Sequence, residues 1–215
     1  MDKKALRNLS YGVYVVTSTI GDKKVGCIAN SAMQVTSNNP TIAISINHDN
    51  YTNKAIKETK KFGLSILKEN SDSKIIGEFG FKSSKDTDKF ENVSYEEMEG
   101  IPVITDSCGK MVLEVIDMME TDTHTIFLGK VINADGYTND NPMTYKYYHE
   151  KLKGTSPKNA PTYEEKEEVK QGNSAKTKKW KCKICGYVYE GESVPEDFIC
   201  PICGQPHTEF YLVED

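Results

Sequence analysis

The chain has 215 residues, of which 37% are apolar and 27% charged, and its formal net charge is −5. This length accommodates one domain of ordinary size and one small domain. The sequence contains no run of about 18 or more apolar residues, so we expect no membrane-spanning helix. The N-terminus lacks the apolar stretch and cleavage site of a secretory signal, and the acidic charge argues against nucleic acid as a partner.

Residues 1–160 show mainly β patterns. Runs rich in β-branched and aromatic residues predict strands over residues 11–18 and 24–29, joined as a hairpin at Gly21-Asp22, and further strands over 41–46, 62–67, 110–117 and 123–132. Helices are predicted over residues 52–61, with Thr52 or Asn53 as N-cap, and over 73–79. About six strands with only one or two helices favour an antiparallel barrel over a doubly wound sheet. Neither a G-x-G-x-x-G nor a P-loop motif is present, so we expect no Rossmann crevice.

A polar, charged run follows from Glu164 to Lys179 and predicts a linker. We therefore expect a first domain over residues 1–155, a linker over 156–178 and a second domain over 179–215. As a coil, the run would span about 22 Å root-mean-square, so the second domain could move between its own body and an outside partner.

The second domain carries two cysteine pairs, Cys182-Lys-Ile-Cys185-Gly and Cys200-Pro-Ile-Cys203-Gly. Two residues between cysteines let both thiolates reach one ion, and the following glycine permits the positive φ that turns the chain beneath it. The spacing predicts a tetrahedral S₄ site for a structural zinc or a single redox iron. Cys27 and Cys108 are more consistent with small buried residues than with a disulfide, and thiolate ligation indicates a reducing cytoplasm.

The surroundings of the cysteines resemble rubredoxin, in the compact form found at the end of rubrerythrins. The resemblance rests on Gly186-Tyr-Val-Tyr189 and Pro195-Glu-Asp-Phe198, with an aromatic core expected from Trp180, Tyr187, Tyr189, Phe198 and Phe210. It favours iron, with a zinc ribbon as the lesser alternative. A domain of about 36 residues has too little core to fold without its metal.

The charge is concentrated on the second domain. Residues 180–215 contain two basic and seven acidic side chains, a net −5. An electropositive redox protein is the expected partner, because the field would speed the encounter.

The first domain resembles the flavin reductase family. The similar segments are residues 26–40, 44–47, 50–52, 85–90 and 124–131. The resemblance implies an FMN-binding split β-barrel, usually a homodimer with the flavin near the subunit interface. Together with the rubredoxin-like end, the whole chain resembles the high-molecular-weight rubredoxins of anaerobic bacteria. In that family, FMN reduced by NAD(P)H passes single electrons to iron and on to flavodiiron oxygen or nitric oxide reductases.

The resemblance also implies site residues. The phosphate, ribityl chain and ring edge of FMN would contact Ala29, Asn30, Ser31, Gln34, Val35, Thr36, Asn47, Tyr51, Thr52 and Lys85. A helix N-terminus near Thr52 would favour the phosphate. His124 would lie near the ring as the catalytic candidate, although a histidine at the end of a strand can also be purely structural. Tyr145, Tyr147 and Tyr148 are expected to pack internally or to form part of a dimer contact.

These features predict an NAD(P)H-dependent oxidoreductase that passes electrons through FMN to an Fe(Cys)₄ centre. Two alternatives stay open: a non-catalytic FMN/iron electron carrier, and a flavin-binding interaction protein stabilised by zinc. NADH and NADPH are equally compatible with the sequence, since it contains no ribose-reading acidic residue of a Rossmann fold.

Overall fold

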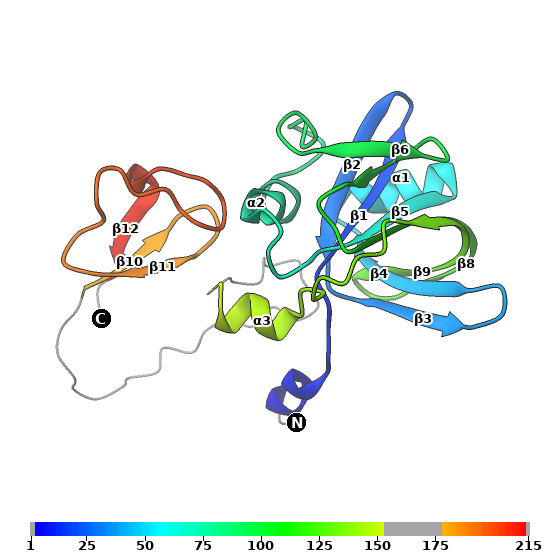
Figure 1. Cartoon of the computed structure of the whole chain (residues 1–215), viewed down its shortest axis with the longest axis horizontal. Helices are drawn as coiled ribbons and strands as arrows, with labels where there is room; N and C mark the ends of the chain where they lie inside the picture. Colours follow the sequence, from blue (N-terminus) through cyan, green and yellow to red (C-terminus); the bar gives the residue numbers. More distant parts are fainter. Residues whose placement is uncertain (1–2, 153–177, 214–215) are drawn as a thin grey trace.

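The structure, a computed structural model, describes residues 3–152 and 178–213 (Figure 1). A 3-10 helix, η1 (Lys3–Asn8), precedes the strands β1 (Tyr14–Ile20), β2 (Lys23–Ala29), β3 (Ala32–Thr36), β4 (Thr41–Asn47), β5 (Lys61–Ile66), β6 (Tyr95–Met98), β7 (Ile101–Ile104), β8 (Gly109–Glu120) and β9 (His124–Asp135). The helices of this part are α1 (Tyr51–Thr59), α2 (Ser73–Phe81) and α3 (Tyr145–Glu150). The second part contains β10 (Lys179–Cys182), β11 (Val188–Glu190), the 3-10 helix η2 (His207–Glu209) and β12 (Phe210–Val213). The predicted mainly β fold is confirmed.

Seven strands of the first domain form one antiparallel sheet in the order β2-β1-β5-β8-β9-β4-β3. The long β8–β9 pair has two register shifts, between Val112 and Leu113 and between Val115 and Asp117. Such bulges bend a strand and increase its twist. The sheet therefore curls, and β2 comes close to β4 (Figure 1).

The inside of the curled sheet is filled by apolar side chains from β1, β2, β4, β5, β8, β9 and α1. Phe62 and Phe127 are both completely buried in this cluster. Gly129 permits the packing, because a Cβ at this position would lie 2.7 Å from the Phe62 ring and 2.9 Å from Leu113. Burial alternates along the first half of β9: Thr125, Phe127 and Gly129 are buried, and His124 lies on the opposite face.

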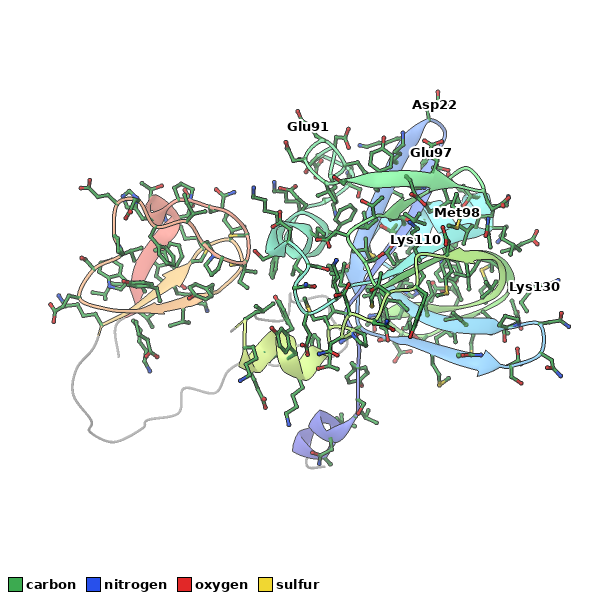
Figure 2. All side chains as sticks on the ribbon, viewed as in Figure 1. Asp22, Glu91, Glu97, Met98, Lys110 and Lys130 are labelled. Carbon is green, nitrogen blue, oxygen red and sulfur yellow. The ribbon has the colours of Figure 1, made fainter. Side chains whose placement is uncertain are left out.

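The β6–β7 hairpin packs against β8 and was not predicted. Met98, Ile101 and Val103 form a small apolar cluster with Val112. Lys110 Nζ lies 2.9 Å from Glu96 Oε1, and Figure 2 shows Met98 and Lys110 on this side of the molecule.

The two longer helices correspond to the predicted ones. The N-cap of α1 is Asn50 and not Thr52 or Asn53, because the Asn50 side chain accepts a hydrogen bond from Thr52 N at 3.2 Å. Helix α2 lies over β2 with Phe79 against Gly26, where a Cβ would meet the ring at 2.7 Å. Strand β3 and helix α3 were not predicted; within α3, Tyr148 packs internally and is 4% exposed.

The second domain is a three-stranded sheet in the order β11-β10-β12, and its predicted aromatic core is confirmed. Phe198 is central, with ring centroids 4.8 Å from Tyr189 and 5.5 Å from Phe210. The predicted linker, residues 156–178, lies outside the described residues except for Lys178, and the predicted domain boundaries stay predictions. No helix in the described ranges is long and apolar enough to cross a membrane.

Candidate metal centre and flavin site

The four cysteines of the second domain meet in one buried cluster. Their sulfur atoms all lie within 4.8 Å of one another. The Sγ–Sγ distances are 3.6 Å for Cys182–Cys203 and 3.4 Å for Cys185–Cys200. A tetrahedral site with metal–sulfur bonds of about 2.3 Å requires sulfurs about 3.8 Å apart. The donor set therefore fits one tetrahedral ion, as the spacing predicted.

The backbone around the cysteines supports an anionic sulfur cluster. Gly186 and Gly204 have φ of 74° and 68°, the left-handed conformation that glycine adopts without strain. Each closes a turn by donating its N–H to the carbonyl of Cys182 or Cys200 at 2.9 Å. The pKa of the Cys200 thiol is lowered, because neighbouring thiols and backbone N–H groups donate hydrogen bonds to its sulfur. The backbone N–H groups of Ile202 and Cys203 would also stabilise a metal-bound thiolate at Cys200.

A second polar cluster lies in the first domain, where β2 ends, β4 ends and α1 begins. Ser31 donates to Asn30 Oδ1 at 2.8 Å, and its carbonyl accepts Ser45 N at 3.3 Å. Two residues farther along β4, Asn47 pairs with His124 of β9. The structure thus gathers Ala29, Asn30, Ser31, Asn47, Tyr51, Thr52 and His124 from the predicted site.

Three predicted residues lie elsewhere in the same chain. Gln34, Val35 and Thr36 are exposed at the far end of β3, and Thr36 pairs with Thr41. Asn47 lies six positions after Thr41 in β4, about 20 Å along an extended strand. The Thr36 hydroxyl already contacts Asn39 O at 3.0 Å and Thr41 Oγ1 at 2.9 Å, which is a turn-stabilising role.

Lys85 lies close to Tyr51 at the edge of the cluster. Its carbonyl accepts a hydrogen bond from Lys23 Nζ at 3.0 Å, and that ammonium lies 5.9 Å from the centre of the Tyr51 ring. The Lys85 side chain is exposed. The Lys23 ammonium thus lies beside Tyr51, the first residue of α1, where the helix dipole also favours an anion.

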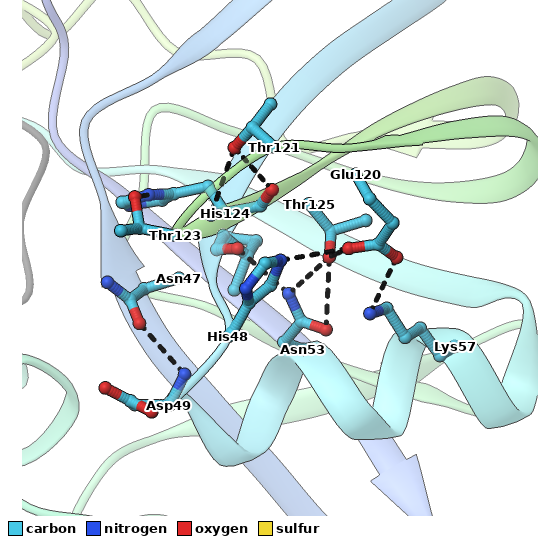
Figure 3. A network of polar contacts seen from close by, with 11 residues as sticks. Asn47, His48, Asp49, Asn53, Lys57, Glu120, Thr121, Thr123, His124 and Thr125 are labelled. Atoms are coloured by element: carbon cyan, nitrogen blue, oxygen red, sulfur yellow. Dashed lines mark hydrogen bonds and ion pairs between the residues drawn. The ribbon is translucent and has the colours of Figure 1, made fainter.

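A hydrogen-bonded network holds the His124 end of this cluster in place (Figure 3). Glu120 is central: its carboxylate lies 2.8 Å from Lys57 Nζ and 2.9 Å from His48 Nε2, and it accepts the Thr125 hydroxyl at 2.9 Å. Asn53 donates to Thr125 Oγ1 at 3.0 Å. The pKa of Glu120 is lowered, mainly by the bond to Lys57, so the network contains a carboxylate at neutral pH.

This network was not predicted. Its members come from the turn after β4, α1, β8 and β9 and share no sequence motif, so only the fold brings them together. His48 is exposed in a turn, and its contact with Glu120 makes it part of the network.

Two buried polar atoms of the cluster have no hydrogen-bond partner in the described structure, Thr52 Oγ1 and His124 Nε2. A third such atom, His207 Nδ1, belongs to the second domain. Buried polar atoms without partners are rare in proteins. The polar neighbour of Thr52 is the Cys27 thiol, a weak acceptor. His124 Nδ1 lies 2.8 Å from Thr123 Oγ1, so the other ring nitrogen, Nε2, is the one that can meet a ligand. Burial lowers the pKa of the His124 imidazole. Both atoms therefore fit a site for a polar cofactor.

Cys27 and Cys108 are buried and unpaired, as predicted. Burial raises the pKa of both thiols, so neither is a reactive thiolate at neutral pH.

Comparison with known proteins identifies both domains. Residues 6–156 match the model of the flavin reductase like domain, and residues 180–211 match the rubrerythrin, rubredoxin-like domain. The high molecular weight rubredoxin of Moorella thermoacetica is 38% identical over 95% of this chain and 96% of its own length. A ferric-chelate reductase (NAD(P)H) of Archaeoglobus fulgidus is 36% identical over 76% of this chain and 98% of its own length.

Solved structures agree on the first domain. An NADH:FAD oxidoreductase of Streptomyces globisporus superposes with a TM-score of 0.60 and 27% identity, covering 66% of this chain and 87% of that one. The predicted FMN-type flavin, iron and oxidoreductase class are thereby supported for this chain. The chain belongs to the flavin reductase family and, with its C-terminal rubredoxin-like S₄ domain, has the domain arrangement of the high molecular weight rubredoxin.

Proposed function

We propose that this protein takes a hydride from NAD(P)H onto FMN and passes the two electrons, one at a time, to the iron held by Cys182, Cys185, Cys200 and Cys203. The observation that carries the proposal is one chain containing both a flavin reductase-like barrel and four sulfurs within 4.8 Å of one another. The bound flavin and iron supply the redox chemistry, and the protein aligns the reactants and excludes water.

Within the barrel, we place the flavin in the cluster at the start of α1. Ser31, Thr52 and Lys85 would serve its phosphate and ribityl chain, and Asn30 and Asn47 its ring edge. The partnerless Thr52 hydroxyl supports this placement, since a bound cofactor would supply its missing hydrogen bond. We assign His124 to the nicotinamide side of the ring. Its Nδ1 contacts Thr123 Oγ1 and its backbone N–H donates to Thr121 Oγ1, beside the network around Glu120 (Figure 3).

A homodimer is part of the proposal. Its support is a set of exposed apolar side chains on β3, β8 and β9: Met33, Val35, Ile116, Met118, Met119 and Ile132. Exposed apolar patches commonly mark protein interfaces. In a dimer, the far end of β3 with Gln34, Val35 and Thr36 could complete the flavin site of the other subunit. Met119→Glu is expected to shift sedimentation toward the monomer, and an unchanged dimer would exclude this surface.

The electron acceptor is proposed as a redox protein such as a flavodiiron oxygen or nitric oxide reductase. The acidic surface of the second domain supports an electropositive partner. The unpaired thiols and thiolate ligation suit the reducing cytoplasm.

The proposed function is tested by visible spectra of anaerobically purified protein before and after NADH or NADPH, with metal analysis on the same sample. Bleaching of both the flavin and the ferric–thiolate bands is expected. A zinc-containing yellow protein, or cofactor bands that neither nucleotide changes, would refute the proposal and favour the interaction protein or the carrier, respectively.

The flavin placement has its own test in a matched pair of threonines. Thr52→Val should weaken FMN binding in a fluorescence titration, whereas Thr36→Val should affect it only if the β3 end joins the site. Unchanged FMN affinity in Thr52→Val would move the flavin away from α1.

A further inference from the structure

The two cysteine turns have the same local sequence pattern but different surroundings. Ile184 and Ile202 each precede the second cysteine of their pair. Ile184 is 43% exposed, whereas Ile202 is 1% exposed. Because the turns are equivalent in sequence, the difference must come from what covers Ile202.

Helix α2 of the first domain covers it. A Cβ at Gly77 would lie 2.8 Å from Cys203 Cα and 2.9 Å from the Ile202 carbonyl oxygen. Ile75, Ile76 and Phe79 of the same helix belong to one buried cluster with Ile202 and the four cysteines. Figure 1 shows α2 between the small three-stranded sheet and β2.

Glycine is costly inside a helix, by about 1 kcal/mol relative to alanine, so Gly77 needs a reason. The approach of the Cys203 backbone supplies one, because any side chain at this position would collide with it. The surface of α2 around Gly77 is therefore shaped to receive the second cysteine turn.

The same helix connects this contact to the proposed flavin site. Gly80 of α2 lies against Ile28 of β2, where a Cβ would be 3.5 Å from Ile28 Cγ1. Ile28 is followed directly by Ala29, Asn30 and Ser31. Gly77 and Gly80 are three residues apart and lie on the same side of α2, so this helix contacts both the Cys203 turn and the strand that leads into the proposed flavin site.

We propose that the turn of residues 200–204 docks on α2 at Gly77 as the contact through which electrons enter the iron centre. This inference rests on the proposed function. NAD(P)H supplies two electrons to the flavin, and each docking event moves one electron to the ferric centre, which becomes ferrous. An external acceptor then reoxidises the centre before the second electron follows. The first turn, with Ile184 exposed, stays available to that acceptor.

Two variants disrupt the contact and a third serves as a matched control. Ile202→Glu places a charge in the contact, Gly77→Ala adds a Cβ while favouring the helix, and Ile184→Glu makes the same change on the exposed turn. An unchanged ferric–thiolate spectrum shows in each case that the second domain is folded.

Hydrogen exchange of the full-length protein measures docking independently of activity. Protection of residues 73–81 should fall by about tenfold or more in Ile202→Glu and Gly77→Ala and stay at the wild-type level in Ile184→Glu, since one buried isoleucine corresponds to at least that factor in an equilibrium. Equal protection of residues 73–81 from hydrogen exchange in the wild type and all three variants would refute the proposed docking.

Rapid mixing with NADH under anaerobic conditions measures the electron route. The flavin band should bleach at the wild-type rate in every variant, and the iron band about tenfold or more slowly in the two docking variants alone. Lost protection with an unchanged rate of iron reduction would overturn the route. If NADH and NADPH bleach neither band of the wild type, the proposed function fails, while hydrogen exchange still decides the docking.

Discussion

Lys89 is a buried lysine that joins α2 to β2. It is 3% exposed, and its ammonium donates hydrogen bonds to the carbonyls of Gly26 at 2.8 Å and Phe79 at 3.3 Å. Burial lowers the pKa of Lys89 to about 8, against 10.5 for a solvated lysine, although the nearby Cys27 and Glu78 act in the opposite direction.

The lowered pKa of Lys89 makes the free energy of unfolding depend on pH in a defined direction. Because the folded state holds this proton less tightly than the unfolded state, the unfolded chain binds more protons between pH 8 and 10.5, and the free energy of unfolding rises with pH in that window. For these two pKa values, the rise between about pH 7.5 and 9.5 is about 2 kcal/mol. The charged lysine thus weakens the barrel at neutral pH.

Comparison with Lys89→Met isolates the contribution of the Lys89 charge to the free energy of unfolding, because methionine keeps an apolar side chain of similar length and removes the charge. Urea unfolding of the first domain, followed by circular dichroism at pH 7.5 and 9.5, gives the free energy of unfolding of both proteins. The wild type should gain about 2 kcal/mol relative to the variant between the two pH values. A difference that does not change with pH would show that Lys89 titrates as a solvated lysine, and a falling one would reverse the reasoning.

Three further changes test the rest of the structure. Cys200→Ser should unfold the second domain and shift the emission of the sole tryptophan, Trp180, to the red, because the metal holds that domain together; Cys108→Ser should leave the emission unchanged. Phe127→Ala should lower the free energy of unfolding of the barrel by about 3–5 kcal/mol in urea titrations, since the ring is completely buried, and Tyr137→Ala, at an 86% exposed site, should leave it nearly unchanged. Asn50→Ala should cost about 1 kcal/mol in thermal unfolding through loss of the α1 cap, and Asn50→Ser should restore most of it.

The metal centre could be predicted from sequence because its geometry is local. Each pair of cysteines and the glycine after it lie within five residues, and the turn they form depends on those residues alone. The aromatic core was predictable for a related reason, since a domain this small has few apolar residues to choose from. By contrast, β3 has no alternating pattern, because nearly all of its side chains are exposed.

The proposed flavin site was only partly predictable, because it depends on contacts between distant segments. The N-cap of α1 was predicted two or three residues too late, since Asn50, Thr52 and Asn53 are all acceptable caps and only the Asn50 contact to Thr52 N distinguishes them. The network around Glu120 joins residues up to 72 positions apart. Lys89 was also missed, because lysine is almost never fully buried and sequence alone gives no sign of its exposure.

The strongest lesson comes from Ile184 and Ile202. The two positions are equivalent in sequence, so any reasoning from local pattern must assign them the same exposure. Their difference, 43% against 1%, arises only because the first domain presents Gly77 to one turn and leaves the other open. The two metal-binding turns thereby have different surroundings, one against the first domain and one exposed, which in the proposed electron route is the face that meets an acceptor. An electron carrier that must receive and deliver through a single small centre requires this distinction.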